Sequence, residues 1–196
     1  MIKKILLCWA LMGPMMAAAQ NTYTVDPAAT KVGWVGKKVT GEHNGSIQVK
    51  GGSLQWGTNG LQGGEVVVDM STIKDLDMDE DGASRLEAHL NSKDFFNTSE
   101  FKTATFKITR VEKLTPSSSG QPNYTVAGDL TIKGITKPVT FQVEAWQVRG
   151  GVRAKGTLSF DRTLYGIKFR SGQFFDALGD RMIYDMIDLS FDLMAQ

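Results

Sequence analysis

Hydrophobic and polar residues alternate along most of this chain, which is the pattern of strands with one buried face. The clearest example runs from Tyr124 to Ala145, where apolar side chains recur mostly at alternate positions before and after Gly134. Gly134 lies where the chain must reverse. Pro138 cannot donate a ladder hydrogen bond and therefore indicates the start of the second strand. These residues predict a β-hairpin with one buried face on each strand.

The same alternation recurs often enough to predict an all-β protein of at least eight strands. The connections between the segments are short and rich in turn residues, which is typical of antiparallel neighbours. Besides the hairpin, the alternating segments centre on Val32 and Trp34, Ile47 and Val49, Val66 to Met70, Ala104 to Ile108, Val152 to Phe160, and Ile187 to Leu193.

One segment, from Asp79 to Asn91, has the spacing of a helix instead. Leu86 and Leu90 are four residues apart, and Ala83 is three residues before Leu86, so the three share one helical face. The acidic residues at 79–81 would lie at the positive helix N-terminus. A sheet of one-sided strands must either pack on a second sheet or close into a barrel, and the alternation alone leaves both open.

The first nineteen residues have the features of a cleaved signal peptide. Lys3 and Lys4 precede an apolar run that is too short to span a bilayer, and three alanines end the segment, so we expect cleavage before Gln20. The alternatives are a retained membrane anchor and a lipoprotein, but Gly13 and Pro14 interrupt the run and Cys8 lies inside it. Residues 20–196 then form one exported domain without cysteine.

Charge and residue content argue against nucleic-acid binding and against catalysis. Cleavage removes two of the 22 basic residues and leaves 20 against 21 acidic ones, which gives no electrostatic reason to expect nucleic acid. The exported part has two histidines, His43 and His89, and no nucleophile-elbow or phosphate-loop motif. We therefore expect no catalytic residues, no cofactor and no bound metal.

The segment from Asp77 to Gly82 resembles the first half of a calcium loop. It places carboxylates at loop positions 1, 3 and 5 and glycine at position 6, but position 12 is Ala88, where a bidentate glutamate is needed. Glu87 is one residue too early, which turns its carboxylate by about 100° around the helix. We interpret the segment as an acidic helix start on a solvated face.

Aromatic residues crowd the regions after the helix and before the last strand. They include Phe95, Phe96, Tyr165, Phe169, Phe174 and Phe175. Each alone is most simply a core residue. Together with the glycines and cations between Tyr165 and Leu178, they are typical of a barrel rim that admits an apolar chain.

The order of these elements resembles the YceI-like lipid and polyisoprenoid-binding proteins from about Tyr23 to Ala195. The resemblance rests on HLNSKDFF at His89 to Phe96, TATF at Thr103 to Phe106 and FDRTLYGI at Phe160 to Ile167, together with the hairpin. It implies a lipocalin-like closed antiparallel β-barrel with one short helix near the mouth. It also implies a periplasmic protein that carries or sequesters a polyisoprenoid or similar lipid, such as a quinone, a polyprenyl phosphate, a fatty acid or an amide.

In such a barrel the apolar strand faces converge on one interior. The residues expected to line it or its mouth are Val68, Phe95, Phe106, Val126, Phe141, Leu158, Tyr165, Phe169, Phe174 and Phe191. Arg85 and His89, four apart on the helix, are the candidate contacts to a polar head group. The expected partners are the lipid and, transiently, a membrane. The alternatives are an envelope stress or interaction protein with a filled barrel and an enzyme that acts on a bound lipid.

Overall fold

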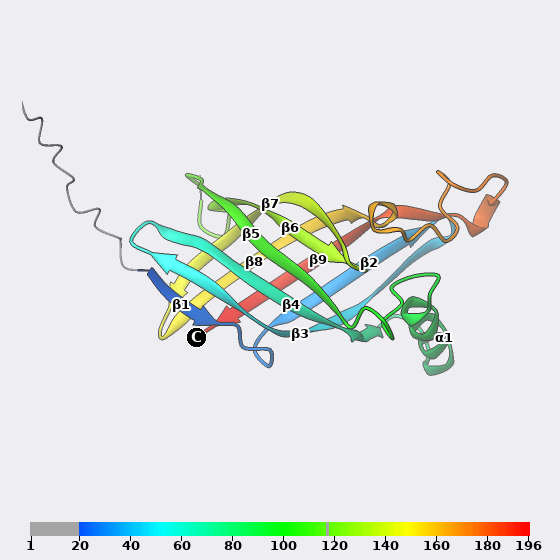
Figure 1. Cartoon of the computed structure of the whole chain (residues 1–196), viewed down its shortest axis with the longest axis horizontal. Coiled ribbons are helices and arrows are strands. Elements are labelled where there is room, and N and C mark those ends of the chain that lie inside the picture. Colours follow the sequence, from blue (N-terminus) through cyan, green and yellow to red (C-terminus); the bar gives the residue numbers. More distant parts are fainter. Residues whose placement is uncertain (1–19, 117) are drawn as a thin grey trace, which may run out of the picture.

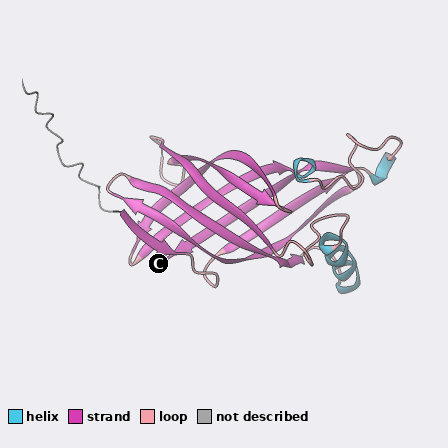
Figure 2. Cartoon of the chain, viewed as in Figure 1, coloured by secondary structure: helices cyan, strands magenta, loops and turns pink. Residues whose placement is uncertain are grey.

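A computed structural model describes residues 20–116 and 118–196, and the predicted signal peptide lies outside this range. Nine strands, one α-helix and two short 3₁₀ helices follow one another in the described residues (Figures 1 and 2). The strands are β1 (Gln20–Thr24), β2 (Lys31–Lys38), β3 (Gly41–Gly57), β4 (Gly60–Asp75), β5 (Thr103–Lys113), β6 (Tyr124–Ile132), β7 (Ile135–Val148), β8 (Gly151–Asp161) and β9 (Ile183–Ala195). The helices are α1 (Glu80–Asn91), η1 (Arg162–Tyr165) and η2 (Gly179–Arg181).

The strands form one antiparallel sheet that closes on itself. Its order is β3-β2-β9-β8-β7-β6-β5-β4, and the pairing of β3 with β4 joins the two ends into an eight-stranded barrel. β1 pairs with the far end of β3 outside this ring. The predicted closed barrel with one α-helix is therefore confirmed, and the sandwich is excluded.

The hairpin between β6 and β7 turns through Lys133 and Gly134. Both have positive φ, 51° and 73°, which is the geometry of a type I′ turn. Pro138 was expected to begin the second strand, but β7 starts three residues earlier, at Ile135. Counting from the turn, Pro138 faces Asp129 at a position without ladder hydrogen bonds, so its nitrogen points away from β6. A proline therefore fits inside this strand.

Helix α1 lies at one end of the barrel, opposite the end that holds β1 and the C-terminus (Figure 1). Asp79 caps the helix by accepting a hydrogen bond from the backbone N–H of Gly82 at 2.8 Å. Glu87 ties the helix to β4 because its carboxylate accepts from Lys74 Nζ at 2.8 Å and from the backbone N–H of Asp75 at 3.1 Å. These contacts hold α1 beside the barrel mouth.

Two apolar clusters fill the two ends of the barrel interior. One surrounds Val126, Ala154 and Ala195 near the C-terminus, and the other surrounds Met70, Phe95 and Phe160 near α1. Within the described residues, no helix has the length and apolar character needed to cross a bilayer.

Candidate ligand-binding cavity

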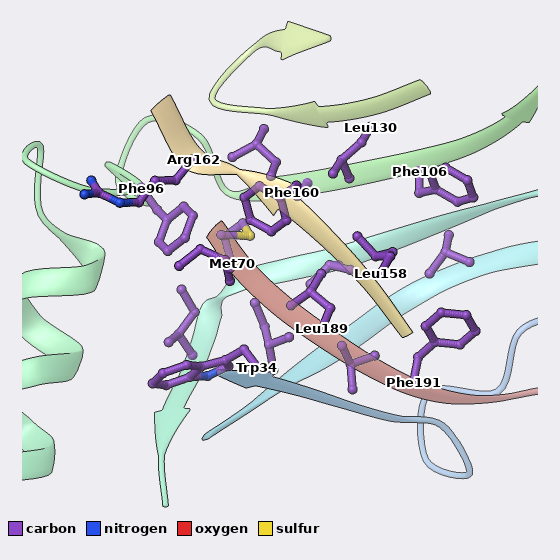
Figure 3. A pocket seen from close by; sticks show the side chains of 18 of the residues that line it. Trp34, Met70, Phe96, Phe106, Leu130, Leu158, Phe160, Arg162, Leu189 and Phe191 are labelled. Atoms are coloured by element: carbon purple, nitrogen blue, oxygen red, sulfur yellow. The ribbon is translucent and has the colours of Figure 1, made fainter. Parts of the chain in front are cut away.

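A cavity of about 240 Å³ lies inside the barrel between the two apolar clusters. The inward-facing residues of the barrel strands line it, because alternate residues of a strand point to the same face. Figure 3 shows Phe106 of β5, Leu158 of β8, and Leu189 and Phe191 of β9 projecting into this space. An apolar cavity of this kind favours a ligand that is itself apolar along most of its length.

The charged and titratable groups that line the cavity are all basic. They are Lys38, His43 and Arg162, and none of the described lining residues is an aspartate or glutamate. Lys37 also borders the cavity, but its side chain turns to the outer face. Lys37 forms an ion pair with Asp188 at 2.8 Å, and the hydrogen bond to that carboxylate raises the pKa of Lys37. The surface of the cavity is thus almost entirely apolar, and the few charged residues on its wall are basic.

Seven of the ten residues expected at the barrel lining and mouth lie on the cavity wall. They are Val68, Phe95, Phe106, Val126, Phe141, Leu158 and Phe191. They come from β4, β5, β6, β7, β8 and β9 and from the segment after α1. Phe106 and Phe141 are in contact, with ring centroids 5.2 Å apart, and Phe191 lies 5.9 Å from Phe141.

The other three residues lie elsewhere. Tyr165 is buried behind Phe160, with ring centroids 5.6 Å apart, and does not line this cavity. Phe169 packs against His89 and Phe95 at 4.5 and 5.8 Å. Phe174 is 45% exposed on the outer loop, where Lys168 Nζ lies 4.6 Å above its ring. The aromatic residues before β9 are thus divided between the core, the helix contact and the surface.

The two candidate head-group contacts on α1 also lie outside the cavity. Arg85 is exposed on the helix surface. The His89 ring is held between Phe169 at 4.5 Å and Phe95 at 5.0 Å, and its Nε2 is buried with no hydrogen-bond partner among the described residues. His89 therefore helps to pack α1 onto the aromatic residues at the barrel end.

Arg162, which the sequence analysis did not select, is the fully buried cation of the cavity wall. Its guanidinium donates to the backbone carbonyls of Ile167 at 2.9 Å, Ile183 at 3.1 Å and Tyr184 at 3.2 Å, and to Asp185 Oδ1 at 3.1 Å. Burial lowers the pKa of this guanidinium, and the charge of Asp185 opposes the change. These bonds join η1, the following loop and β9 at the mouth.

One local feature of the sequence points to a structural role for Arg162. It follows Asp161, whose carboxylate accepts from the backbone N–H of Thr163 at 2.8 Å and caps η1. An arginine directly after a strand and a capping aspartate is forced into the first turn of a new element. Its burial depends on carbonyls about twenty residues later, which local pattern does not indicate.

Comparisons with known proteins agree with this architecture. Residues 23–195 match the model of the YceI-like domain. A curated relative, UPF0312 protein Shew185_3055 of Shewanella baltica, is 36% identical over 110 residues, which cover 52% of this chain and 53% of that protein. The chain thus spans about half the length of the curated relatives that it matches.

Solved structures share the fold. BcnA of Burkholderia cenocepacia has a TM-score of 0.68 at 22% identity, covering 88% of this chain and 99% of its own. A polyisoprenoid binding domain from Saccharophagus degradans has a TM-score of 0.61 at 13% identity, covering 89% and 97%. The Campylobacter jejuni YCEI protein has a TM-score of 0.52 at 13% identity, covering 100% and 99%. With its family model matched over nearly the whole described chain, this protein belongs to the YceI-like domain family.

Proposed function

We propose that this protein binds one long-chain lipid inside the barrel, with the apolar chain in the cavity and an anionic head near the basic residues of its wall. The observation that carries the proposal is the 240 Å³ apolar cavity, whose few charged lining residues are basic. Burial of each methylene contributes about 0.8 kcal/mol, so ten of them supply a gross gain of about 8 kcal/mol. A chain can therefore be held without a specific contact to every atom.

The proposed ligand class is a polyisoprenoid or a fatty acyl chain that ends in a phosphate or carboxylate. The family supports lipid binding, and the Saccharophagus degradans neighbour is described as a polyisoprenoid binding domain. The proposed role is carriage or sequestration without catalysis. We further propose that cleavage before Gln20 exports the protein to the periplasm, where an insoluble chain needs a carrier.

Native mass spectrometry of the protein purified from its own envelope, followed by lipid extraction, tests this proposal. The expected result is one lipid mass per chain, lost on denaturation. A displacement assay with a fluorescent fatty acid then measures exchange. A protein that yields no lipid from its envelope and takes up none in the assay would instead support the filled-barrel alternative.

A further inference from the structure

Three polar side chains meet at the barrel mouth although they are distant in sequence. Asp75 ends β4, and Asp77 follows two residues later in the bend that leads to α1. Asp77 lies against the start of β3, where its Oδ1 accepts from the backbone N–H of Asn44 at 2.9 Å and its Oδ2 is 3.1 Å from His43 Nδ1. One ligand atom from each of His43, Asp75 and Asp77 lies within 4.8 Å of the others.

The Asp75 carboxylate is buried with one oxygen uncompensated. The residue is 7% exposed. Its Oδ1 accepts from the backbone N–H groups of Asp77 at 3.3 Å and Met78 at 2.9 Å, but Oδ2 contacts no hydrogen-bond donor among the described residues. A buried carboxylate oxygen without a partner is costly, and a second carboxylate beside it raises that cost. A positive charge among these groups would offset both effects.

We propose that His43, Asp75 and Asp77 bind a divalent transition-metal ion, with Zn²⁺ or Mn²⁺ as the ion class. One imidazole nitrogen and two carboxylate oxygens suit these ions better than Ca²⁺, which takes oxygen ligands. Ligand atoms at about 2.0 to 2.2 Å from one ion lie at most about 4.4 Å apart, close to the observed spacing. The side chains of His43 and Asp77 are 23% and 28% exposed, so further positions on the ion would remain open to solvent or to a ligand.

The site would differ from the calcium loop considered for residues 77–82. Asp79, which would be the third position of that calcium loop, instead caps α1 and does not belong to the His43, Asp75 and Asp77 cluster. His43 also lines the ligand cavity, so the ion would lie at the cavity rim. It would tie the start of β3 to the segment that leads into α1.

Calorimetric titration of tag-free, chelator-dialysed protein with ZnCl₂, MnCl₂ and CaCl₂ tests the site. The expected result is one Zn²⁺ or Mn²⁺ per chain and a rise in melting temperature on ion addition, because the ion binds the folded state. Asp75→Asn keeps the oxygen that accepts the backbone bonds and removes the charge. That variant and His43→Gln should each weaken binding about tenfold or more. Asp81→Asn, an exposed change in the first turn of α1, is the matched control and should bind as the wild type does.

Several outcomes would overturn the site. They are a titration with no saturable binding and no thermal shift in the wild type, tighter binding of Ca²⁺ than of either transition metal, and equal affinity in wild type, Asp75→Asn and His43→Gln. The wild-type thermal shift needs no variant, so it decides the matter even if Asp75→Asn folds poorly. If His43, Asp75 and Asp77 instead share a proton and bind no ion, the titration should show no saturable binding and no thermal shift.

A separate observation concerns the barrel wall between β7 and β8. These strands pair only from Val143↔Gly156 to Val148↔Gly151. Beyond Gly156, residues 157–161 of β8 pair with β9, while residues 135–142 of β7 pair with β6. A second cavity, of about 250 Å³, lies where the two strands separate. No ladder hydrogen bond closes the wall at this seam.

The second cavity borders the ligand cavity across the barrel wall. Thr140 and Ser159 border it from the outer face and Val139 from the inner face, while Phe141, Leu158 and Phe160 border both this cavity and the ligand cavity. These last three side chains are thus the partition between the two spaces. Leu164, 52% exposed, stands at the outer side of the seam. Pro138 also lies there and needs no hydrogen-bond partner on that side.

We infer that the lipid chain enters the barrel through this seam. The inference rests on the proposed function. Opening the seam requires rotation of side chains and no loss of strand pairing, because β7 and β8 are not paired there. An exposed apolar side chain at the seam offers the incoming chain a first contact.

A cross-link across the seam tests the route. In a Cys8→Ser background, Thr140→Cys and Ser159→Cys place thiols on the two outer edges, to be joined by a cleavable bis-maleimide. The matched control joins Thr157→Cys to Ser190→Cys, which face each other in the paired β8–β9 ladder. The seam cross-link should slow uptake of a fluorescent fatty acid at least tenfold, cleavage should restore it, and the control should not change it. Equal uptake rates in both cross-linked proteins would overturn the route. Absence of binding in the uncross-linked protein would refute the proposed function itself.

Discussion

Replacing Val68 by tryptophan should abolish lipid binding without destabilising the protein, whereas the same change at Val126 should destabilise it. Both residues lie on the cavity wall, but Val68 is only half-buried and Val126 is 1% exposed. An inward-facing side chain with accessible surface, such as Val68, borders open space in the cavity. An inward-facing side chain without accessible surface, such as Val126, is already enclosed by its neighbours. The same added volume therefore meets space at one position and packed atoms at the other.

The cavity volume sets the scale of the effect. At about 24 cal/mol per Å³, an empty cavity of this size costs the folded state about 6 kcal/mol. A side chain that fills a third of it would recover about 2 kcal/mol, which corresponds to a rise in melting temperature of about 4 to 8 °C for a domain of this length. Overpacking at Val126 should instead cost about 1 to 3 kcal/mol.

Urea denaturation of the lipid-free proteins and uptake of a fluorescent fatty acid check both halves of this prediction. Val68→Trp should match or exceed the wild type in unfolding free energy and should take up no probe. A loss of about 1 to 3 kcal/mol at Val68, equal to that at Val126, would mean that the barrel is already filled. Unchanged probe uptake by Val68→Trp would mean that the chain binds elsewhere.

Further predictions concern the charged and buried groups around the cavity. Arg162→Met should lower the unfolding free energy in urea by about 3 to 5 kcal/mol, because Asp185 loses its buried partner. Tyr165→Phe should raise it by about 1 to 3 kcal/mol, because the change removes a buried hydroxyl without a partner among the described residues. Burial raises the pKa of Tyr165 to about 12. The stability linked to this group is therefore complete below pH 10 and is lost as the pH rises through 12. A spectroscopic titration of the tyrosine phenols should show one late step that Tyr165→Phe lacks. A hydrogen bond from Arg153 lowers the pKa of Asp192. The stability that this carboxylate contributes above the unfolded pKa of about 3.9 is therefore lost as the pH falls through its folded pKa. Asp192→Asn should reduce the fall in melting temperature between pH 6 and pH 2.

The strands and the helix could be predicted because their signals are local. Alternation from Tyr124 to Ala145 indicates two strands wherever they pair, and the spacing of Leu86 and Leu90 indicates a helix in any fold. The closure of the sheet into a barrel could not be predicted from local patterns. It depends on β3 pairing with both β2 and β4, which is a matter of register between distant segments. The resemblance to the family supplied that choice.

The candidate site shows the same division. Residues on an alternating strand face, such as Phe141 and Phe191, lie on the cavity wall because the barrel turns every such face inward. Arg162 and the pairing of His43 with Asp77 were missed because their partners are distant in the sequence. Phe174 was expected at the lining or mouth and is exposed on the loop before β9, since aromatic residues in a loop carry no periodicity that indicates their surroundings.

The most direct test of lipid binding inside the barrel is quenching of tryptophan fluorescence by a brominated fatty acid. Trp34 lines the cavity, and Trp146 lies on β7 beside the buried Ala145, on the opposite face of the strand. Two proteins are needed, each with one of these as its single tryptophan and the others changed to phenylalanine. Binding inside the barrel predicts saturable quenching of Trp34 at one chain per protein and little quenching of Trp146. Equal quenching of both, or of neither, would contradict the account.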